Sequence, residues 1–142
     1  MELDFAFELP GIARFRSNYY YQMESLAAAF RIIPERPLSL DELGAPAIFK
    51  ELIKKEKGLI LVTGPTGSGK STTLAAMINE INEQYQKHIL TMEDPVEFVH
   101  AHKKALISQR SIGKDSRSFA NAIKSALRED PDIILVGEMR DK

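Results

Sequence analysis

Eight consecutive residues in the middle of the chain, 64–71, have the types and the spacing needed to hold phosphate groups. They read Gly-Pro-Thr-Gly-Ser-Gly-Lys-Ser, which matches the pattern G-x-x-x-x-G-K-[ST]. Glycines let the backbone turn tightly with its amides pointing inward, and the amino end of a following helix adds positive partial charge. The pattern therefore predicts a nucleotide site, with Lys70 on the β- and γ-phosphates and Ser71 on magnesium. The residues predicted to hold the nucleotide are Gly64, Pro65, Thr66, Gly67, Ser68, Gly69, Lys70, Ser71 and Thr72.

Acidic residues follow two apolar segments further along the chain: Glu93, Asp94 and Glu97 follow one, and Glu138 follows the other. In a phosphate-loop fold the chemistry takes place at the carboxyl ends of strands, so acids there are candidate metal ligands or general bases. The segment before Glu138 resembles a Walker B strand in which Gly137 replaces the usual terminal aspartate. We predict that Glu138 orients or deprotonates a water molecule. In the other group, we expect one acid to bind magnesium through water while another pairs with a basic neighbour.

Three arginines, Arg14, Arg16 and Arg31, interrupt apolar and aromatic residues near the start of the chain. A guanidinium in such a place is unfavourable unless it meets an anion. Arg14 and Arg16 would share one face of a strand. The spacing alone leaves two interpretations open: the arginines contact an anion, or they lie on a solvent-exposed strand face.

The residues before the phosphate loop divide into a β-rich section, 1–38, and a helical linker, 39–57. Strands are predicted at 3–9, 12–21 and 26–33, where large apolar, aromatic and branched residues alternate or are enriched, as in an antiparallel meander. In the linker, the first four residues, Ser-Leu-Asp-Glu, have capping-box spacing and predict the start of a short helix. A second helix would present one apolar face, formed by Ile48, Phe49, Leu52 and Ile53.

The rest of the chain, 58–142, alternates apolar runs of strand length with amphipathic helices. This pattern is typical of βα units that form a mostly parallel sheet, so the predicted fold class is α/β with a phosphate-loop core. The predicted elements are strands at 58–63, 88–92 and 132–136, helices at 69–85 and 115–129, and short antiparallel pieces at 96–99 and 105–109. A sheet of three main strands with no helix after the last leaves one face uncovered. We therefore expect the chain to be a truncated fragment.

Composition excludes several classes of function. The 142 residues include no cysteine, which removes disulfides and thiolate metal sites and, with no secretory signal pattern, favours the cytosol. A net charge of −1 provides no field that would hold nucleic acid or an anionic membrane. The apolar runs are far shorter than the roughly 20 residues that span a bilayer. His88, His100 and His102 lack partners at metal-site spacing and are predicted to lie at the surface.

Three segments occur in a specific order: GPTGSGKSTTLAAM at 64–77, ILTMEDPVEFVH at 89–100 and SALREDPDIILVGEMRD at 125–141. Together they resemble the type IV pilus retraction ATPases and the wider family of type II/IV secretion ATPases. The resemblance covers essentially the whole chain. It implies a RecA-like ATPase core, truncated before the family's His box and preceded by the carboxyl-terminal part of a small PAS-like domain.

The same resemblance implies a function and its partners. A member of this family is a hexameric motor that uses ATP and Mg²⁺, works in the cytoplasm at the inner membrane, and acts with the proteins of the pilus base. By analogy with the family, the Walker A motif is 64–71 and the catalytic Walker B glutamate is Glu138. The family's Asp box comprises Glu93, Asp94 and Glu97, and its arginines that reach the phosphates are Arg16 and Arg31.

Three alternatives remain open at the level of sequence. The chain could bind nucleotide without turnover, because parts of the family's catalytic machinery follow later in the sequence of its members. It could belong to a related secretion or pilus-assembly ATPase. A third alternative is a phosphate-loop phosphotransferase with a small acceptor, although no acceptor pocket is recognisable.

Overall fold

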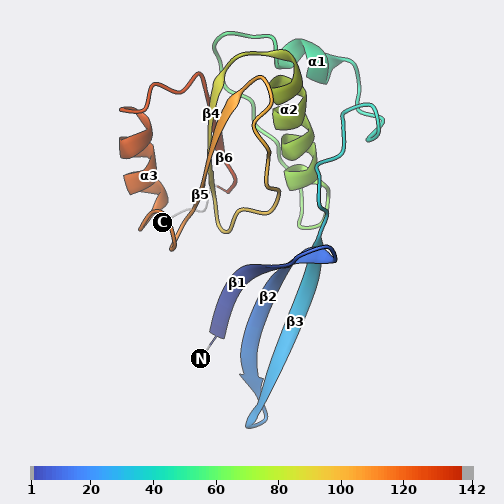
Figure 1. The fold of residues 1–142 in the computed structure, drawn as a ribbon, viewed down its shortest axis with the longest axis vertical. Coiled ribbons are helices and arrows are strands. Elements are labelled where there is room, and N and C mark those ends of the chain that lie inside the picture. Colours follow the sequence, from blue (N-terminus) through green and yellow to red (C-terminus); the bar gives the residue numbers. More distant parts are fainter. Residues whose placement is uncertain (1, 139–142) are drawn as a thin grey trace.

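The computed structural model describes residues 2–138, which form two β-sheets joined by a long segment with little regular structure (Figure 1). The first sheet contains β1 (Glu2–Leu9), β2 (Ala13–Gln22) and β3 (Ser25–Ile33). The second contains β4 (His88–Glu93), β5 (Leu106–Ser111) and β6 (Ile133–Val136). The helices are α1 (Ile48–Leu52), α2 (Lys70–Gln84) and α3 (Phe119–Ala126). The predicted mixed α/β fold with a β-rich section first is confirmed.

The first sheet is an antiparallel meander, as predicted. Aromatic rings on one of its faces hold the three strands together. The ring centroids of Phe5 and Tyr19 are 5.3 Å apart, and those of Phe7 and Phe30 are 6.2 Å apart. Contacts of this length between aromatic rings are favourable beyond the area that they bury. Because side chains alternate along a strand, the opposite face is left for the polar residues.

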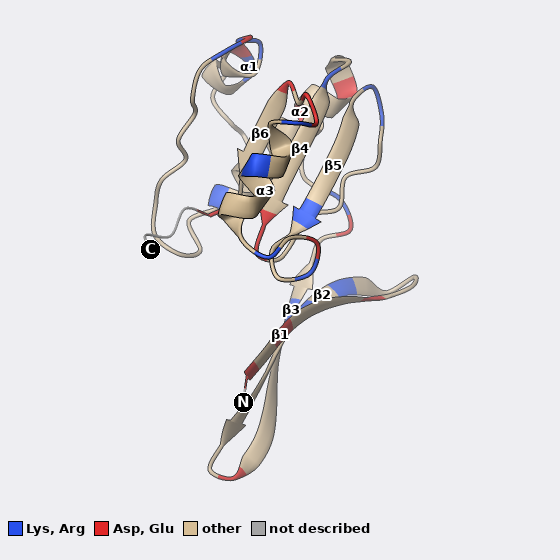
Figure 2. Ribbon diagram, turned by 90° about the vertical axis from the view of Figure 1, so that its left-hand side faces the viewer, with Lys and Arg blue, Asp and Glu red and all other residues tan. Residues whose placement is uncertain are grey.

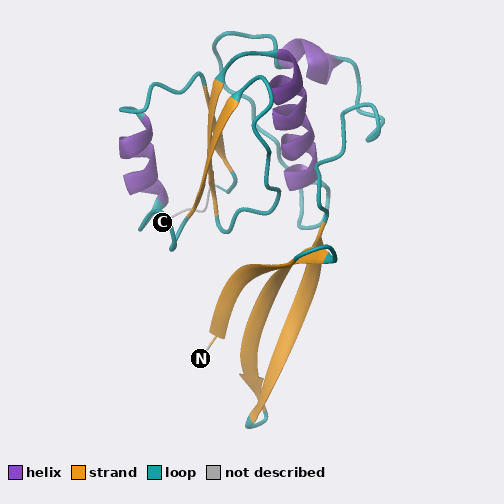
Figure 3. Cartoon of the chain, in the orientation of Figure 1, coloured by secondary structure: helices purple, strands orange, loops and turns teal. Residues whose placement is uncertain are grey.

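The second sheet is parallel, with the strand order β5-β4-β6. Helix α2 lies on one face of this sheet and α3 on the other (Figure 3). The apolar core between α2 and the sheet includes Ile78, Ile81, Ile89 and Ile107. This layering brings the carboxyl ends of β4 and β6 side by side, next to the amino end of α2.

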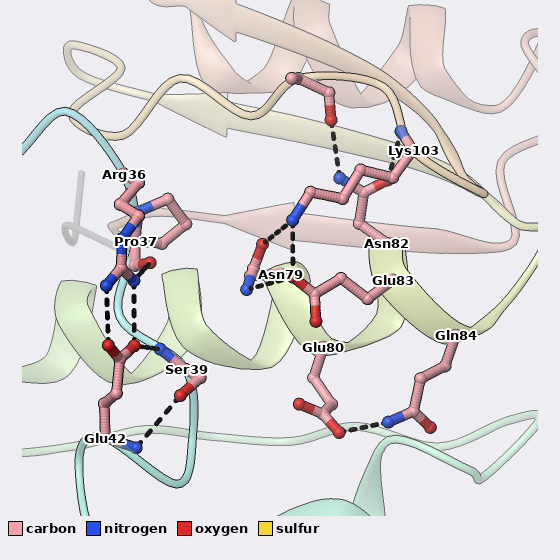
Figure 4. Close-up of polar contacts among 11 residues, drawn as sticks. Arg36, Pro37, Ser39, Glu42, Asn79, Glu80, Asn82, Glu83, Gln84 and Lys103 are labelled. Atoms are coloured by element: carbon pink, nitrogen blue, oxygen red, sulfur yellow. Dashed lines mark hydrogen bonds and ion pairs between the residues drawn. The ribbon is translucent and has the colours of Figure 1, made fainter.

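The prediction of short antiparallel pieces at 96–99 and 105–109 is wrong. β5 pairs in parallel with β4, and no strand forms at the first of these segments. The reason lies in a contact with α2. The Asn82 side chain donates a hydrogen bond to the Ala101 carbonyl (2.7 Å) and accepts one from the Lys103 amide (3.0 Å; Figure 4). These bonds hold residues 101–103 against the carboxyl-terminal part of α2. β5 therefore begins beside the beginning of β4 and runs in the same direction.

The predicted strand at 58–63 is also wrong, because these residues form no strand. Leu59 and Leu61 are 82% and 59% exposed. A strand needs a hydrogen-bonded neighbour, and within residues 2–138 no strand of either sheet pairs with this segment. Residues 58–63 therefore form an irregular segment that leads into the phosphate loop.

The linker contains a turn and one short helix instead of two helices. The capping box forms as predicted: Ser39 Oγ accepts from the Glu42 amide (3.1 Å), and the Glu42 carboxylate accepts from the Ser39 amide (2.8 Å; Figure 4). Arg36 binds the same carboxylate. The chain nevertheless makes only a turn, which Gly44 ends with a φ of 62°. This turn and α1 pack against α2.

The remaining helices and strands of the core match the predictions closely at α2, β4 and β6. α3 is shorter than the predicted 115–129. It begins after Ser118, whose hydroxyl accepts a hydrogen bond from the Asn121 amide (3.2 Å). Such a cap satisfies an otherwise unpaired amide and defines where the helix begins.

Candidate functional site

The phosphate loop folds into a tight turn at the amino end of α2. Gly64, Gly67 and Gly69 have φ values of 156°, 77° and 90°, a region that residues with a side chain rarely adopt. The Lys70 ammonium donates hydrogen bonds to the carbonyls of Gly64 and Pro65, both at 2.8 Å. Lys70 therefore lies across the loop, with its positive charge beside the turn.

The amino end of α2 is suited to an anion. The first-turn amides of a helix have no partner within the helix, and no side chain caps them here. The first turn also contains no acidic residue. With the positive end of the helix dipole and the Lys70 ammonium close by, this arrangement fits the phosphates of a nucleotide.

A pocket lies between α2, β4, β6 and the loop that follows β4. Its volume is about 30 Å³. The residues that line it are Ser71, Leu74, Ala75, Thr91, Glu93, Phe98, His100, Leu135 and Gly137. The structure thus brings together Ser71 and Glu93, two of the predicted magnesium residues. Hydroxyl and carboxylate oxygens are ligands that Mg²⁺ prefers, so the donors present fit this ion.

Glu93 is held by its neighbours at the edge of this pocket. The Thr91 hydroxyl donates a hydrogen bond to its carboxylate (2.7 Å), and the Glu97 amide donates a longer one (3.4 Å). Burial raises the pKa of the Glu93 carboxyl above its ordinary value, although these hydrogen bonds oppose that shift. A cation in the pocket would favour the ionised form.

Gly137 allows β6 to approach Glu93. Seven of the eight glycines have positive φ, and Gly137 does not, so its lack of a side chain has another cause. A Cβ at this position would lie 3.1 Å from Glu93 Cγ and 3.4 Å from Glu93 Cα. The glycine that stands where a Walker B strand usually has aspartate therefore provides room for the acid of β4.

We expect Gly137→Ala to displace the Glu93 side chain and to lower the free energy of unfolding by about 1 kcal/mol, as small overpacking does. Urea unfolding measures the effect. In a Glu93→Ala background the crowding is gone, so the same substitution should be nearly neutral there. Equal costs in both backgrounds would contradict this explanation.

The other predicted acids lie around the pocket without lining it. Asp94 is exposed on the loop after β4, and Glu138 is exposed just beyond Gly137 at the end of β6. Glu97 is half-buried and forms an ion pair with Arg16, with 3.5 Å between the guanidinium and the carboxylate. This is the basic neighbour expected for one acid of the group.

Two arginines of the first sheet, Arg14 and Arg16, contact the core, and Arg31 is exposed. The charged segments at the carboxyl ends of β4 and β5 lie on the side of the core nearest the meander (Figure 2). Arg14 donates to the Val96 carbonyl at 3.5 Å, beside the ion pair of Arg16. The strand register places Arg16 directly opposite Arg31, and like charges in such a pair are unfavourable. An anion near this pair would relieve the repulsion.

The prediction that all three histidines lie at the surface is wrong for His100. Its side chain lines the pocket with Ser71 and Glu93, and its Nδ1 atom is buried. His102 is exposed, as predicted. Sequence reasoning missed His100 and Thr91 because neither stands in a recognisable spacing with the phosphate loop. The position of each depends on how the loop after β4 folds back.

Comparison with known proteins places the chain in a family. Residues 14–142 match the family model described as type II/IV secretion system protein. The chain belongs to this family. It is 62% identical over 141 residues to a twitching motility protein of Neisseria gonorrhoeae and 57% identical over 141 residues to the type IV pilus retraction ATPase PilT of Pseudomonas aeruginosa. These matches cover 99% of the chain and 38% and 41% of the relatives.

Solved structures of family members have the same fold. A crystal structure of the pilus retraction motor PilT with bound ADP matches with a TM-score of 0.93 and 54% identity, covering 99% of this chain and 41% of that one. The ATPase DotB of Legionella pneumophila matches with a TM-score of 0.86 and 35% identity, covering 100% of this chain and 42% of that one. The chain thus spans about two fifths of the length of the relatives it matches. In residues 2–138, no helix is both long enough and apolar enough to span a bilayer.

Proposed function

We propose that this chain is the nucleotide-binding part of a hexameric motor ATPase that powers type IV pilus retraction. The observation that carries the proposal is the phosphate loop, with Lys70 across it and an uncapped α2 behind it, within a chain 57% identical to a retraction ATPase. The proposed location is the cytoplasmic side of the inner membrane, with the proteins of the pilus base as partners. No role in nucleic-acid binding is proposed.

The nucleotide and its metal would be held by residues of the loop and the pocket. Residues 64–72 would bind the phosphates of ATP, and Ser71 would bind Mg²⁺. Glu93 and Asp94 would act on the metal through water, with Glu93 better placed because it shares the pocket with Ser71. The metal ion would supply positive charge that offsets the charge developing on the phosphates.

Four residues would serve hydrolysis. Glu138 would orient a water molecule for attack, with Glu97 as the neighbouring acid. Arg16 and Arg31 would offset negative charge on the phosphates once the meander closes onto a site, in the same chain or in a neighbour. The opposition of Arg16 and Arg31 supports this assignment, because two guanidinium groups side by side favour an anion between them. The ion pair of Arg16 with Glu97 also places Arg16 beside the acids that follow β4.

A second candidate function is a secretion motor. The type II secretion system protein E of Aeromonas hydrophila is 46% identical over 109 residues, covering 73% of this chain and 21% of that protein. The two functions can be distinguished by expressing a protein of the relatives' full length in a strain that lacks its own retraction ATPase. Restored twitching would support retraction, and restored protein secretion in a type II mutant would support the alternative.

Lys70→Ala tests nucleotide binding itself. We expect the affinity for a fluorescent ATP analogue to fall by about 100-fold or more, because the phosphates lose a charge-assisted donor worth about 3 kcal/mol. Lys114→Ala, at an exposed turn, is the matched control and should bind like the wild type. Equal affinity in Lys70→Ala and the wild type would contradict the phosphate-loop assignment.

A further inference from the structure

His100 brings a buried nitrogen to the pocket of Ser71 and Glu93. Its Nδ1 atom is inaccessible to solvent and has no hydrogen-bond partner among the described residues. Buried polar atoms in proteins are nearly always paired, with protein or with ordered water. An unpaired imidazole nitrogen in a residue that shares a pocket with Ser71 and Glu93 therefore indicates that a polar group belongs in that pocket.

The pocket has room for a water molecule. Its volume of about 30 Å³ exceeds the roughly 10–15 Å³ that one water requires. A buried water also needs two to four polar partners. His100, Glu93 and Ser71, each with polar side-chain atoms, line the same space, while Phe98 and Leu135 add apolar walls.

The imidazole is held in place from β5. The Gln109 side chain accepts a hydrogen bond from the His100 amide (2.8 Å) and donates one to the Phe98 carbonyl (2.8 Å). These two bonds fix the backbone on which the ring stands. Burial lowers the pKa of His100 to about 4, and the charge of Lys103 acts in the same direction. At neutral pH the ring is therefore uncharged and adds no repulsion toward a cation.

We propose that His100 is a positioning residue whose Nδ1 holds a water molecule beside Ser71 and Glu93, in the shell of the Mg²⁺ ion that accompanies the nucleotide. This inference rests on the proposed function of the phosphate loop. Mg²⁺ retains several waters when it binds proteins, so groups that orient those waters influence its affinity. His100 acts through the water and does not contact the nucleotide.

The test is a Mg²⁺ titration of the chain in the presence of a fluorescent ATP analogue. Mg²⁺ is expected to increase the affinity for the nucleotide analogue. We expect His100→Leu to raise the Mg²⁺ concentration that gives half of this increase by about 10- to 100-fold, the usual effect of losing a group that orients a metal's ligands. His100→Asn should stay close to the wild type, because its amide takes the place of Nδ1. His102→Asn is the matched control, because His102 is not among the residues that line the pocket and its Nδ1 accepts a hydrogen bond from the Ile107 amide (3.1 Å).

Each outcome has a defined meaning. If the wild type binds no nucleotide, the proposed function fails, and this inference fails with it. If the wild type binds and responds to Mg²⁺ but His100→Leu responds equally, only this inference is overturned. If His100→Leu does not fold, His100→Gln replaces it, because its amide takes the place of Nε2. A response equal to that of His100→Asn would then overturn the inference.

Discussion

Arg31→Ala is expected to lower the rate of ATP hydrolysis by about 10³–10⁵-fold, the range in which arginines that reach a transferring phosphoryl group act. The affinity for ATP should change far less, because the guanidinium meets the phosphates only when the meander closes onto a site. Arg16→Ala should behave alike, since Arg16 lies directly opposite Arg31. The effect is measured as phosphate release by the proposed hexamer, assembled from a protein of the relatives' full length.

The control for these variants is Arg36→Ala, whose guanidinium forms an exposed ion pair with Glu42. Exposed pairs contribute little, so turnover should be unchanged. Mixing an Arg31→Ala protein with a Lys70→Ala protein asks whether the arginine acts between subunits. Partial recovery of phosphate release requires sites built from two chains. Wild-type turnover in both arginine variants would contradict a catalytic role. It would favour the alternative interpretation, in which these arginines lie on a solvent-exposed strand face.

Glu138→Gln is expected to retain ATP binding while turnover falls by about 10²–10⁴-fold, the usual contribution of a positioned general base. The amide keeps the shape of the side chain but lacks the basic oxygen that would orient or deprotonate water. Nucleotide titration and phosphate release, measured on the same preparation, separate binding from catalysis. Glu56→Gln, an exposed acid before the phosphate loop, is the control.

The opposite result for Glu138→Gln would also be informative. Hydrolysis at the wild-type rate would exclude Glu138 as the base and direct attention to Glu97, which lies on the loop after β4. Its carboxylate already forms an ion pair with Arg16. A Glu97→Gln variant would then be expected to show the loss of turnover instead.

Features that depend on neighbours in the sequence could be predicted without the structure. The glycines at 64, 67 and 69 and the lysine that follows them predict the phosphate loop because its turn is determined locally. The meander follows from alternating residues and short turns in the same way. The capping box of Ser39 and Glu42 also forms, although the following residues make a turn and not a helix.

The sequence by itself thus determined the turn of the phosphate loop, the meander and the positions of α2, β4 and β6, since each follows from a pattern of residues close in the chain. Only the tertiary structure decided the direction of β5, the absence of a strand at 58–63 and the surroundings of His100. It also decided that Gly137 makes room for Glu93. These features depend on contacts between distant segments. A hydrophobic or charged pattern indicates that a residue needs a partner, but it does not identify that partner.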